Sequence, residues 1–221
     1  MIEAVIFDLD GVLIDSETVW NSAREQLVRE RGGTWREEAT REMMGMSSVE
    51  WSRFIADELG VELSPEQISD DVVELMAERY RERLPLIPGA VEAVERLAAV
   101  YPLAVASSSN RPLIDAVLEL SGLARNFRAT VSSEEVASGK PAPDVYLEAA
   151  RRLGVSPDRC AAVEDSTNGL RAAASAGMRV VAVPNREFPP SEEALGLADV
   201  VLESLEQLRP ELLLRLGERD R

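Results

Sequence analysis

The chain has 221 residues, 45% of them hydrophobic and 29% charged, and carries a formal net charge of -16 at pH 7. It contains no histidine and one cysteine, Cys160, which excludes Ser–His–Asp and Cys–His catalysis, imidazole metal sites and an internal disulfide. The negative charge, without a compensating basic run, argues against nucleic acid as a partner, and no apolar run approaches the roughly 20 residues of a membrane-spanning helix.

Residues 1–8 have the pattern of a strand and lack the basic start and the cleavage site of a signal peptide. Cys160 lies in the apolar run CAAV, which indicates a buried structural thiol rather than a nucleophile. We therefore expect a cytoplasmic protein, monomeric by default, whose partners are small molecules. Any bound metal should be a hard cation such as Mg²⁺, because carboxylates and hydroxyls are the available ligands.

Short apolar runs recur along the chain, and the later ones alternate with helical patterns. The predicted strands, in chain order, are Ala4–Phe7, Leu103–Ala106, Ala129–Val131, Cys160–Val163, Val180–Val183 and Val200–Leu202. Strands that alternate with helices are typical of βαβ units, in which helices cover both faces of a parallel sheet. The sequence therefore predicts an α/β fold with three layers.

The connection after the first strand is different, because it contains helical patterns and no strand candidate. Apolar side chains recur at helical spacing in three stretches of this connection. Ser64 followed by Pro65 has the pattern of an N-cap and a first helical residue. We expect an all-helical cap domain at residues 16–85, inserted into a core domain made of residues 1–15 and 86–221.

Polar residues that suit a catalytic site follow four of the predicted strands. They are Asp8 and Asp10 after the first strand, Ser107, Ser108, Ser109 and Asn110 after the second, Lys140 beyond the third, and Glu164 and Asp165 after the fourth. Because ligands collect at the carboxyl ends of the strands in an open parallel sheet, we expect these residues to line one pocket. Lys140 is the only lysine among 24 basic residues, and lysine and arginine are not interchangeable.

Carboxylates that lie close together repel one another unless a cation is bound between them. We expect Asp8, Asp10, Glu164 and Asp165 to hold Mg²⁺, with Asp10 contributing its backbone carbonyl. Asp8 would then attack a phosphoryl group and form an aspartyl-phosphate. The side chain of Asp10 would protonate the leaving oxygen as a general acid and later activate water as a general base.

Ser107, Ser108, Asn110 and Lys140 are the expected phosphate-binding residues. The hydroxyl and amide groups can hydrogen-bond phosphoryl oxygens, and Lys140 can balance the charge between Asp8 and the phosphoryl group. The metal, Lys140 and backbone N–H groups would make the pocket locally positive in an acidic protein. We therefore count Lys140 among the catalytic residues as well.

Four motifs, DLDGVLIDSE, ASSSN, GKPAPDVY and VEDSTNGL, together resemble those of the haloacid dehalogenase superfamily, in its phosphatase and β-phosphoglucomutase-like branch with a helical cap. The resemblance covers nearly the whole chain. It implies a Rossmann-like core, Mg²⁺ dependence, the residue roles given above, and a cap that selects a small phosphorylated metabolite. It also implies that Asp15 belongs to the hinge and that Glu17 and Trp20 start the first cap helix near the pocket.

Within this branch, the residues favour a phosphatase. The superfamily's dehalogenases lack the second acidic residue that is present here as Asp10, and the cap has no lysine for the Schiff base of phosphonate hydrolases. Mutases of the β-phosphoglucomutase type have a histidine and an arginine in the cap where this chain has Trp20 and Ser48. We expect a Mg²⁺-dependent phosphatase acting on a small phosphate monoester such as a sugar phosphate, with the mutase as the alternative.

Two other classes of protein fit part of the pattern. A signalling receiver domain also has an acceptor aspartate, a hydroxyl, a lysine and Mg²⁺, but it is shorter and lacks the helical insertion. A catalytically idle binding protein is disfavoured by the intact catalytic set. The sequence leaves open which cap residues face the substrate, the candidates being Trp20, Met43, Met44, Met46, Trp51, Met76 and Arg79.

Overall fold

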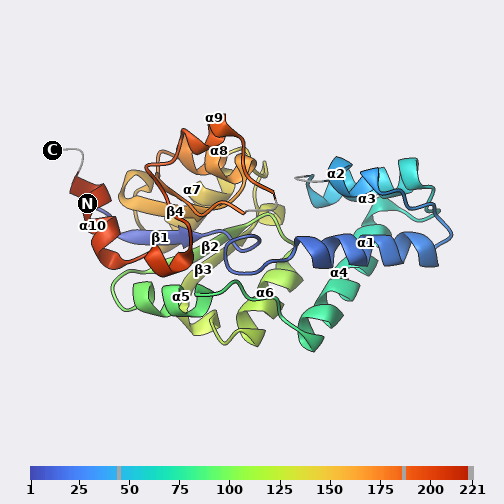
Figure 1. Cartoon of the computed structure of the whole chain (residues 1–221), viewed down its shortest axis with the longest axis horizontal. Helices are drawn as coiled ribbons and strands as arrows, with labels where there is room; N and C mark the ends of the chain where they lie inside the picture. Colours follow the sequence, from blue (N-terminus) through green and yellow to red (C-terminus); the bar gives the residue numbers. More distant parts are fainter. Residues whose placement is uncertain (44–45, 186–187, 219–221) are drawn as a thin grey trace. The chain divides into compact units, whose positions relative to one another are not determined.

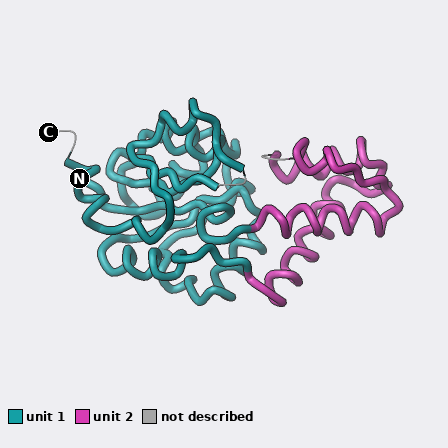
Figure 2. Tube along the Cα trace, viewed as in Figure 1, with its two compact units in different colours: residues 1–15, 85–221 teal, residues 16–84 magenta. Residues whose placement is uncertain are grey.

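The computed structural model describes residues 1–43, 46–185 and 188–218. The chain divides into two compact units, one formed by Met1–Asp15 with Pro85–Arg221 and the other by Ser16–Leu84 (Figure 2). The predicted division differs from this one by placing residue 85 in the helical insertion. Within the described ranges, the structure contains no helix with the length and apolar character needed to cross a bilayer.

The larger unit is built on a six-stranded sheet with the order β3-β2-β1-β4-β5-β6, in which every neighbouring pair is parallel. The strands are β1 (Ala4–Phe7), β2 (Leu103–Ser107), β3 (Phe127–Ser132), β4 (Cys160–Glu164), β5 (Arg179–Ala182) and β6 (Val200–Val201). The predicted parallel sheet is therefore confirmed. The order places β1 at the centre between β2 and β4. The polar residues that follow these three strands therefore lie next to one another at the carboxyl ends of the strands.

Helices cover both faces of this sheet, as predicted (Figure 1). The helices of this unit are α5 (Ala90–Ala98), α6 (Arg111–Leu120), α7 (Asp144–Leu153), α8 (Thr167–Ser175), α9 (Glu192–Leu195) and α10 (Pro210–Glu218), with the short 3-10 helices η1 (Ala124–Asn126), η2 (Ser133–Glu135), η3 (Pro157–Arg159) and η4 (Leu205–Gln207). Right-handed crossovers require that helices leading toward β3 and helices leading toward β6 lie on opposite faces. Accordingly, α5 and α6 lie on one face and α7 and α8 on the other, which gives a Rossmann-like three-layer unit.

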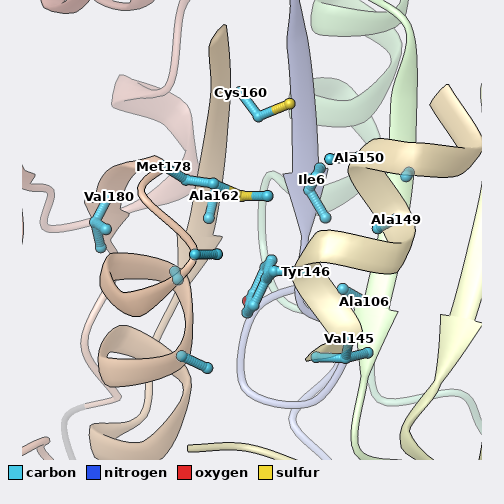
Figure 3. Close-up of a cluster of buried hydrophobic side chains, with 14 of the residues drawn as sticks. Ile6, Ala106, Val145, Tyr146, Ala149, Ala150, Cys160, Ala162, Met178 and Val180 are labelled. Atoms are coloured by element: carbon cyan, nitrogen blue, oxygen red, sulfur yellow. The ribbon is translucent and has the colours of Figure 1, made fainter. Parts of the chain in front are cut away.

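Buried apolar side chains fill the layer between the sheet and the helices α7 and α8 (Figure 3). Ile6 of β1 is fully buried beside Ala149 and Ala150, whose small side chains let α7 pack closely on the sheet. Burying a side chain of the size of Ile6 stabilises the fold by roughly 1.5–3 kcal/mol. Cys160 lies in the same cluster, and burial raises the pKa of its thiol to about 12, in agreement with a structural role.

One edge of the sheet, strand β3, is covered by arginine side chains. The backbone carbonyl of Thr130 accepts hydrogen bonds from Arg152 Nη1 at 2.7 Å and from Arg111 Nη2 at 3.2 Å. Both guanidinium groups also form ion pairs with Glu135, and that of Arg152 contacts Glu148 at 2.7 Å. The edge strand is thus closed over part of its length by side chains of α6 and α7.

The smaller unit is all-helical, as predicted for the cap. Its helices are α1 (Glu17–Glu30), α2 (Glu38–Glu42), α3 (Ser48–Leu59) and α4 (Pro65–Glu82), and α4 packs against both α1 and α3. The predicted start of the last helix is confirmed, since the Ser64 side chain accepts a hydrogen bond from the backbone of Gln67 in a capping box. In the three longer helices, the apolar residues that recur at helical spacing form the faces that pack together.

The candidate specificity residues of the cap differ in burial. Met43, Met76 and Trp51 are buried, and Trp20 is 8% exposed. The rings of Trp20 and Trp51 lie 6.0 Å apart, and the Arg24 guanidinium lies 4.9 Å from each ring. Arg79 donates a hydrogen bond to Gln26 at 2.5 Å, Met46 is half-buried, and Met44 lies outside the described residues.

Candidate active site

Asp8 and Asp10 lie in the turn that follows β1. The backbone N–H of Asp8 donates to the Val163 carbonyl at 3.0 Å, so the end of β1 stays paired with β4. Gly11 then adopts a φ of +78°, a left-handed conformation that suits glycine. A Cβ at Gly11 would also overlap the carboxylate of Asp165. Glycine therefore lets the turn after β1 approach the acidic end of β4.

Lys140, from the loop between β3 and α7, lies between two buried carboxylates. Its Nζ is 2.9 Å from Asp8 Oδ1 and 2.5 Å from Glu164 Oε1, and 5% of its side chain is exposed. Burial acts to lower the pKa of Lys140, but the charges of Asp8 and Glu164 outweigh it and raise the pKa above its ordinary value. The lysine is therefore a fixed positive charge within the acidic cluster.

Glu164 is completely buried at the end of β4 and accepts hydrogen bonds on both carboxylate oxygens. Its Oε1 accepts from Lys140 and from the Tyr146 hydroxyl at 2.8 Å. Its Oε2 accepts from the backbone N–H of Asp165 at 3.0 Å and from the N–H and hydroxyl of Ser166, both at 3.2 Å. These donors compensate for the loss of water around the buried charge.

The segment after β2 forms a tight loop of serines. Ser107 is the last residue of β2 and is fully buried. The backbone N–H of Ser109 donates to Ser107 Oγ at 3.0 Å, and the Ser132 hydroxyl donates to the Ser109 carbonyl at 2.7 Å. The loop is thereby held against the end of β3.

The carboxylate of Asp10 reaches this loop. Its Oδ2 accepts a hydrogen bond from Ser109 Oγ at 2.6 Å and lies 3.5 Å from Ser107 Oγ. Because Asp10 follows β1 and both serines follow β2, these contacts join the ends of two neighbouring strands.

Ser108 and Asn110, the other predicted phosphate-binding residues, have different surroundings. Ser108 is exposed, whereas the Asn110 side chain is buried and donates from Nδ2 to Glu134 at 2.6 Å. The second oxygen of Glu134 accepts from the backbone N–H of Arg111 at 2.9 Å, in the first turn of α6. The Asn110 amide is thus engaged beside η2 in this structure.

The pKa values reflect the crowding of acidic groups. Burial raises the pKa of Asp8 to about 7; Lys140 opposes this increase, and the charges of Glu164 and Asp10 add to it. Burial together with Glu164 and Asp8 raises the pKa of Asp165 well above its ordinary value. One lysine therefore does not neutralise the cluster, and a bound cation would favour the ionised forms.

The acidic residues also have a geometry that suits a divalent cation. Asp8, Glu164 and Asp165 each offer a carboxylate oxygen, and these atoms lie within 4.8 Å of one another. Oδ1 of Asp165 is buried and accepts no hydrogen bond from any residue that the structure describes. Leaving such an oxygen without a donor is costly, and oxygens in this arrangement match the ligands of a hard cation such as Mg²⁺.

The structure thus brings together Asp8, Asp10, Ser107, Lys140, Glu164 and Asp165. Asp15, by contrast, is exposed at the end of the first core segment, where its N–H donates to the Pro85 carbonyl at 2.8 Å.

Two residues that contact the acidic cluster were assigned no role from the sequence. Tyr146 donates to Glu164, and its ring centre lies 5.0 Å from Lys140 Nζ. In the sequence it is part of the apolar face of a helix, which gives no sign of a polar contact. Ser109 was grouped with the serines after β2, and three identical neighbours give no signal in the sequence that would single it out.

The sequence and the fold are similar to those of known proteins. A family model described as haloacid dehalogenase-like hydrolase matches residues 2–177. Hexitol phosphatase B of Escherichia coli (strain K12) is 35% identical over 96% of this chain and 96% of that protein. A phosphorylated carbohydrates phosphatase of Thermotoga maritima is 34% identical over 80% of this chain and 82% of that protein. The structure of β-phosphoglucomutase from Clostridium difficile superposes with a TM-score of 0.81 at 25% identity, covering 98% and 97% of the two chains.

Proposed function

The chain belongs to the haloacid dehalogenase-like hydrolases, and from this premise we propose that it is a Mg²⁺-dependent phosphatase of small sugar phosphates that works through an aspartyl-phosphate on Asp8. Relatives named as phosphatases of hexitols and of phosphorylated carbohydrates support hydrolysis of a phosphate monoester. The observation that carries the proposal is the buried cluster of Asp8 and Asp165, at the ends of β1 and β4, with Lys140 from the loop before α7.

Asp8, Asp165 and the backbone carbonyl of Asp10 would hold the cation. Glu164 would contact the cation through a water molecule rather than directly, because both of its oxygens already accept hydrogen bonds from the protein. When bound, Mg²⁺ supplies positive charge that neutralises the carboxylates and draws electron density from the phosphoryl oxygens.

The chain's own residues then divide the reaction into two steps. An oxygen of Asp8 forms a bond to phosphorus as the bond to the leaving oxygen breaks, and Asp10 gives its proton to that oxygen. In the second step, Asp10 takes a proton from water as the water oxygen bonds to phosphorus and the bond to Asp8 breaks. Lys140 and Ser107 stabilise the negative charge on the phosphoryl group in both steps.

The likeness to β-phosphoglucomutase makes a sugar phosphate mutase the second candidate. A mutase has to hold a second phosphate and delay attack by water. The cap positions that carry a histidine and an arginine in such mutases hold Trp20 and Ser48 here, and the Trp20 ring packs on Trp51. Neither residue brings a positive charge, so we favour hydrolysis.

The proposal is tested by phosphate release from 4-nitrophenyl phosphate and from a panel of hexitol, hexose and pentose phosphates, with and without Mg²⁺. We expect turnover that requires the cation and that is abolished in Asp8→Asn. Conversion of β-glucose 1-phosphate to glucose 6-phosphate without phosphate release would indicate the mutase instead. Stoichiometric labelling of Asp8 without turnover would indicate a receiver, and no reaction with any substrate would contradict both candidates.

A further inference from the structure

Ser109 has no part in the two steps above, yet it makes the shorter of the two serine contacts to Asp10. Its hydroxyl lies 2.6 Å from Asp10 Oδ2, whereas that of Ser107 lies 3.5 Å from the same oxygen. The shorter distance is that of a strong O–H···O bond, and the longer one is at the limit of any bond. Ser109 is 6% exposed, so water competes poorly for this contact.

The position of the Ser109 hydroxyl is itself fixed. The backbone N–H of Ser109 is bonded to Ser107 Oγ, and its carbonyl accepts from the Ser132 hydroxyl. The loop is therefore held from the ends of both β2 and β3. A donor mounted in this way holds its acceptor in one orientation, which is the requirement for a preorganised catalytic group.

We propose that Ser109 is a positioning residue for Asp10. Its hydroxyl holds Oδ2 and so fixes the orientation of the carboxyl group that gives its proton to the leaving oxygen and later receives the proton of the attacking water. This inference rests on the proposed function, since it needs Asp10 to act on the leaving group. Misplacing a reacting group by about 1 Å can cost about 100-fold in rate, so loss of the hydroxyl should matter.

Two substrates of nearly the same shape separate positioning of the acid from a general disturbance. The 4-nitrophenolate ion is a weak base that leaves without a proton, whereas phenolate is a stronger base whose departure benefits from one. In Ser109→Ala we expect kcat/KM to fall about 10-fold or more for phenyl phosphate and no more than about 3-fold for 4-nitrophenyl phosphate. kcat/KM is the informative quantity because it reports the step in which the leaving group departs.

Two further variants distinguish the loss of the Ser109 hydroxyl from a general disruption of the loop. Ser133→Ala removes a hydroxyl that contacts the same loop through the Ser107 carbonyl at 3.3 Å rather than through Asp10, so its effect should be equal for both substrates. Ser109→Cys keeps nearly the same volume but offers only a weak donor, and it should reproduce the unequal losses of Ser109→Ala. Thermal unfolding of each variant shows whether the fold is retained.

A double mutant completes the test. If Ser109 acts through Asp10, adding Ser109→Ala to Asp10→Ala should cause no further decrease in kcat/KM for phenyl phosphate. Equal losses for the two substrates, no loss for either, or a full further loss in the Asp10→Ala background would each overturn the role of Ser109. A wild-type protein that releases phosphate neither from the aryl phosphates nor from any sugar phosphate of the panel would instead contradict the proposed function.

Discussion

Lys140 and Asp8 form an ion pair of 2.9 Å in which 5% and 9% of the two side chains are exposed. Removing one partner of a buried pair typically destabilises a protein by about 3–5 kcal/mol, because the other charge is left without compensation. Asp8 can escape this cost by taking up a proton, since its pKa is already raised to about 7. The ion pair should therefore contribute to stability to an extent that depends on pH.

Lys140→Ala should lower kcat for 4-nitrophenyl phosphate by about 100-fold or more, because the developing charge loses its balancing cation. The fold should persist, with a free energy of unfolding reduced more at pH 8 than at pH 5.5, where Asp8 is protonated. Steady-state kinetics and urea unfolding at both pH values measure the two effects. Arg125→Ala, at a cation whose side chain is 79% exposed, is the control. Near-normal rates in Lys140→Ala would contradict its assigned role.

The contribution of Asp8 to the stability of the protein without added metal should fall as pH rises from 3.8 to about 7. The pKa of Asp8 is higher in the folded state than its ordinary value of 3.8, so the folded state binds more protons in this window. Mg²⁺ binds the ionised carboxylates, and its stabilising effect should therefore grow over the same window.

The measurement is Tm with and without MgCl₂ at pH 5.5 and pH 8. We expect a larger increase in Tm at pH 8, and a reduced one in Asp165→Asn, which removes a carboxylate charge from the cluster. An increase of the same size at both pH values in the wild-type protein would argue against competition between the cation and protons.

Gly11→Ala should abolish the Mg²⁺-dependent increase in Tm as well as activity. The substitution adds a Cβ where it would overlap the Asp165 carboxylate, in addition to the strain of a φ of +78°. Gly122→Ala is the matched control, because Gly122 has a φ of +72° and nothing within 4 Å of the added carbon. Both variants should lose about 1–2 kcal/mol of stability from the left-handed conformation. Equal retention of activity in both would show that clearance at Gly11 is unimportant.

Tyr146→Phe should reduce the free energy of unfolding by about 2 kcal/mol, because Glu164 loses a donor at 2.8 Å in a fully buried position. Tyr101→Phe is the contrasting variant. The Tyr101 hydroxyl is buried and has no hydrogen-bond partner within the described part of the chain, so its removal should be neutral or slightly stabilising. Urea unfolding of both variants measures the difference, and equal losses would be inconsistent with a structural role of the Glu164 contact.

The central strands could be predicted closely because they are continuous apolar runs. β1 and β4 begin at the predicted residues, Ala4 and Cys160, since both are buried on both faces of the sheet. β3 begins at Phe127 rather than Ala129, because the exposed Arg128 interrupts the apolar run in an edge strand. Helix α2 was missed because its five residues, EATRE, show no apolar periodicity. Strand order depends on contacts between distant segments and is not visible in local patterns.

The acidic residues and Lys140 could be predicted because residue type and position after a strand suffice to select them. The separate roles of Ser107, Ser108 and Ser109 could not, since three identical neighbours differ only in the backbone conformation that buries two of them and exposes the third. The contact of Tyr146 with Glu164 could not be predicted for another reason. A tyrosine ring satisfies an apolar helix pattern whether or not its hydroxyl reaches a carboxylate.

The arginines over β3 have a consequence for the behaviour of the protein at high concentration. An open strand edge is a template on which another chain can add a strand and start aggregation. For a second copy to extend this sheet at Thr130, the guanidinium groups of Arg111 and Arg152 would have to leave the carbonyl and give up their ion pairs with Glu135. The arginine side chains that cover strand β3 should therefore disfavour the addition of strands from other copies of the chain.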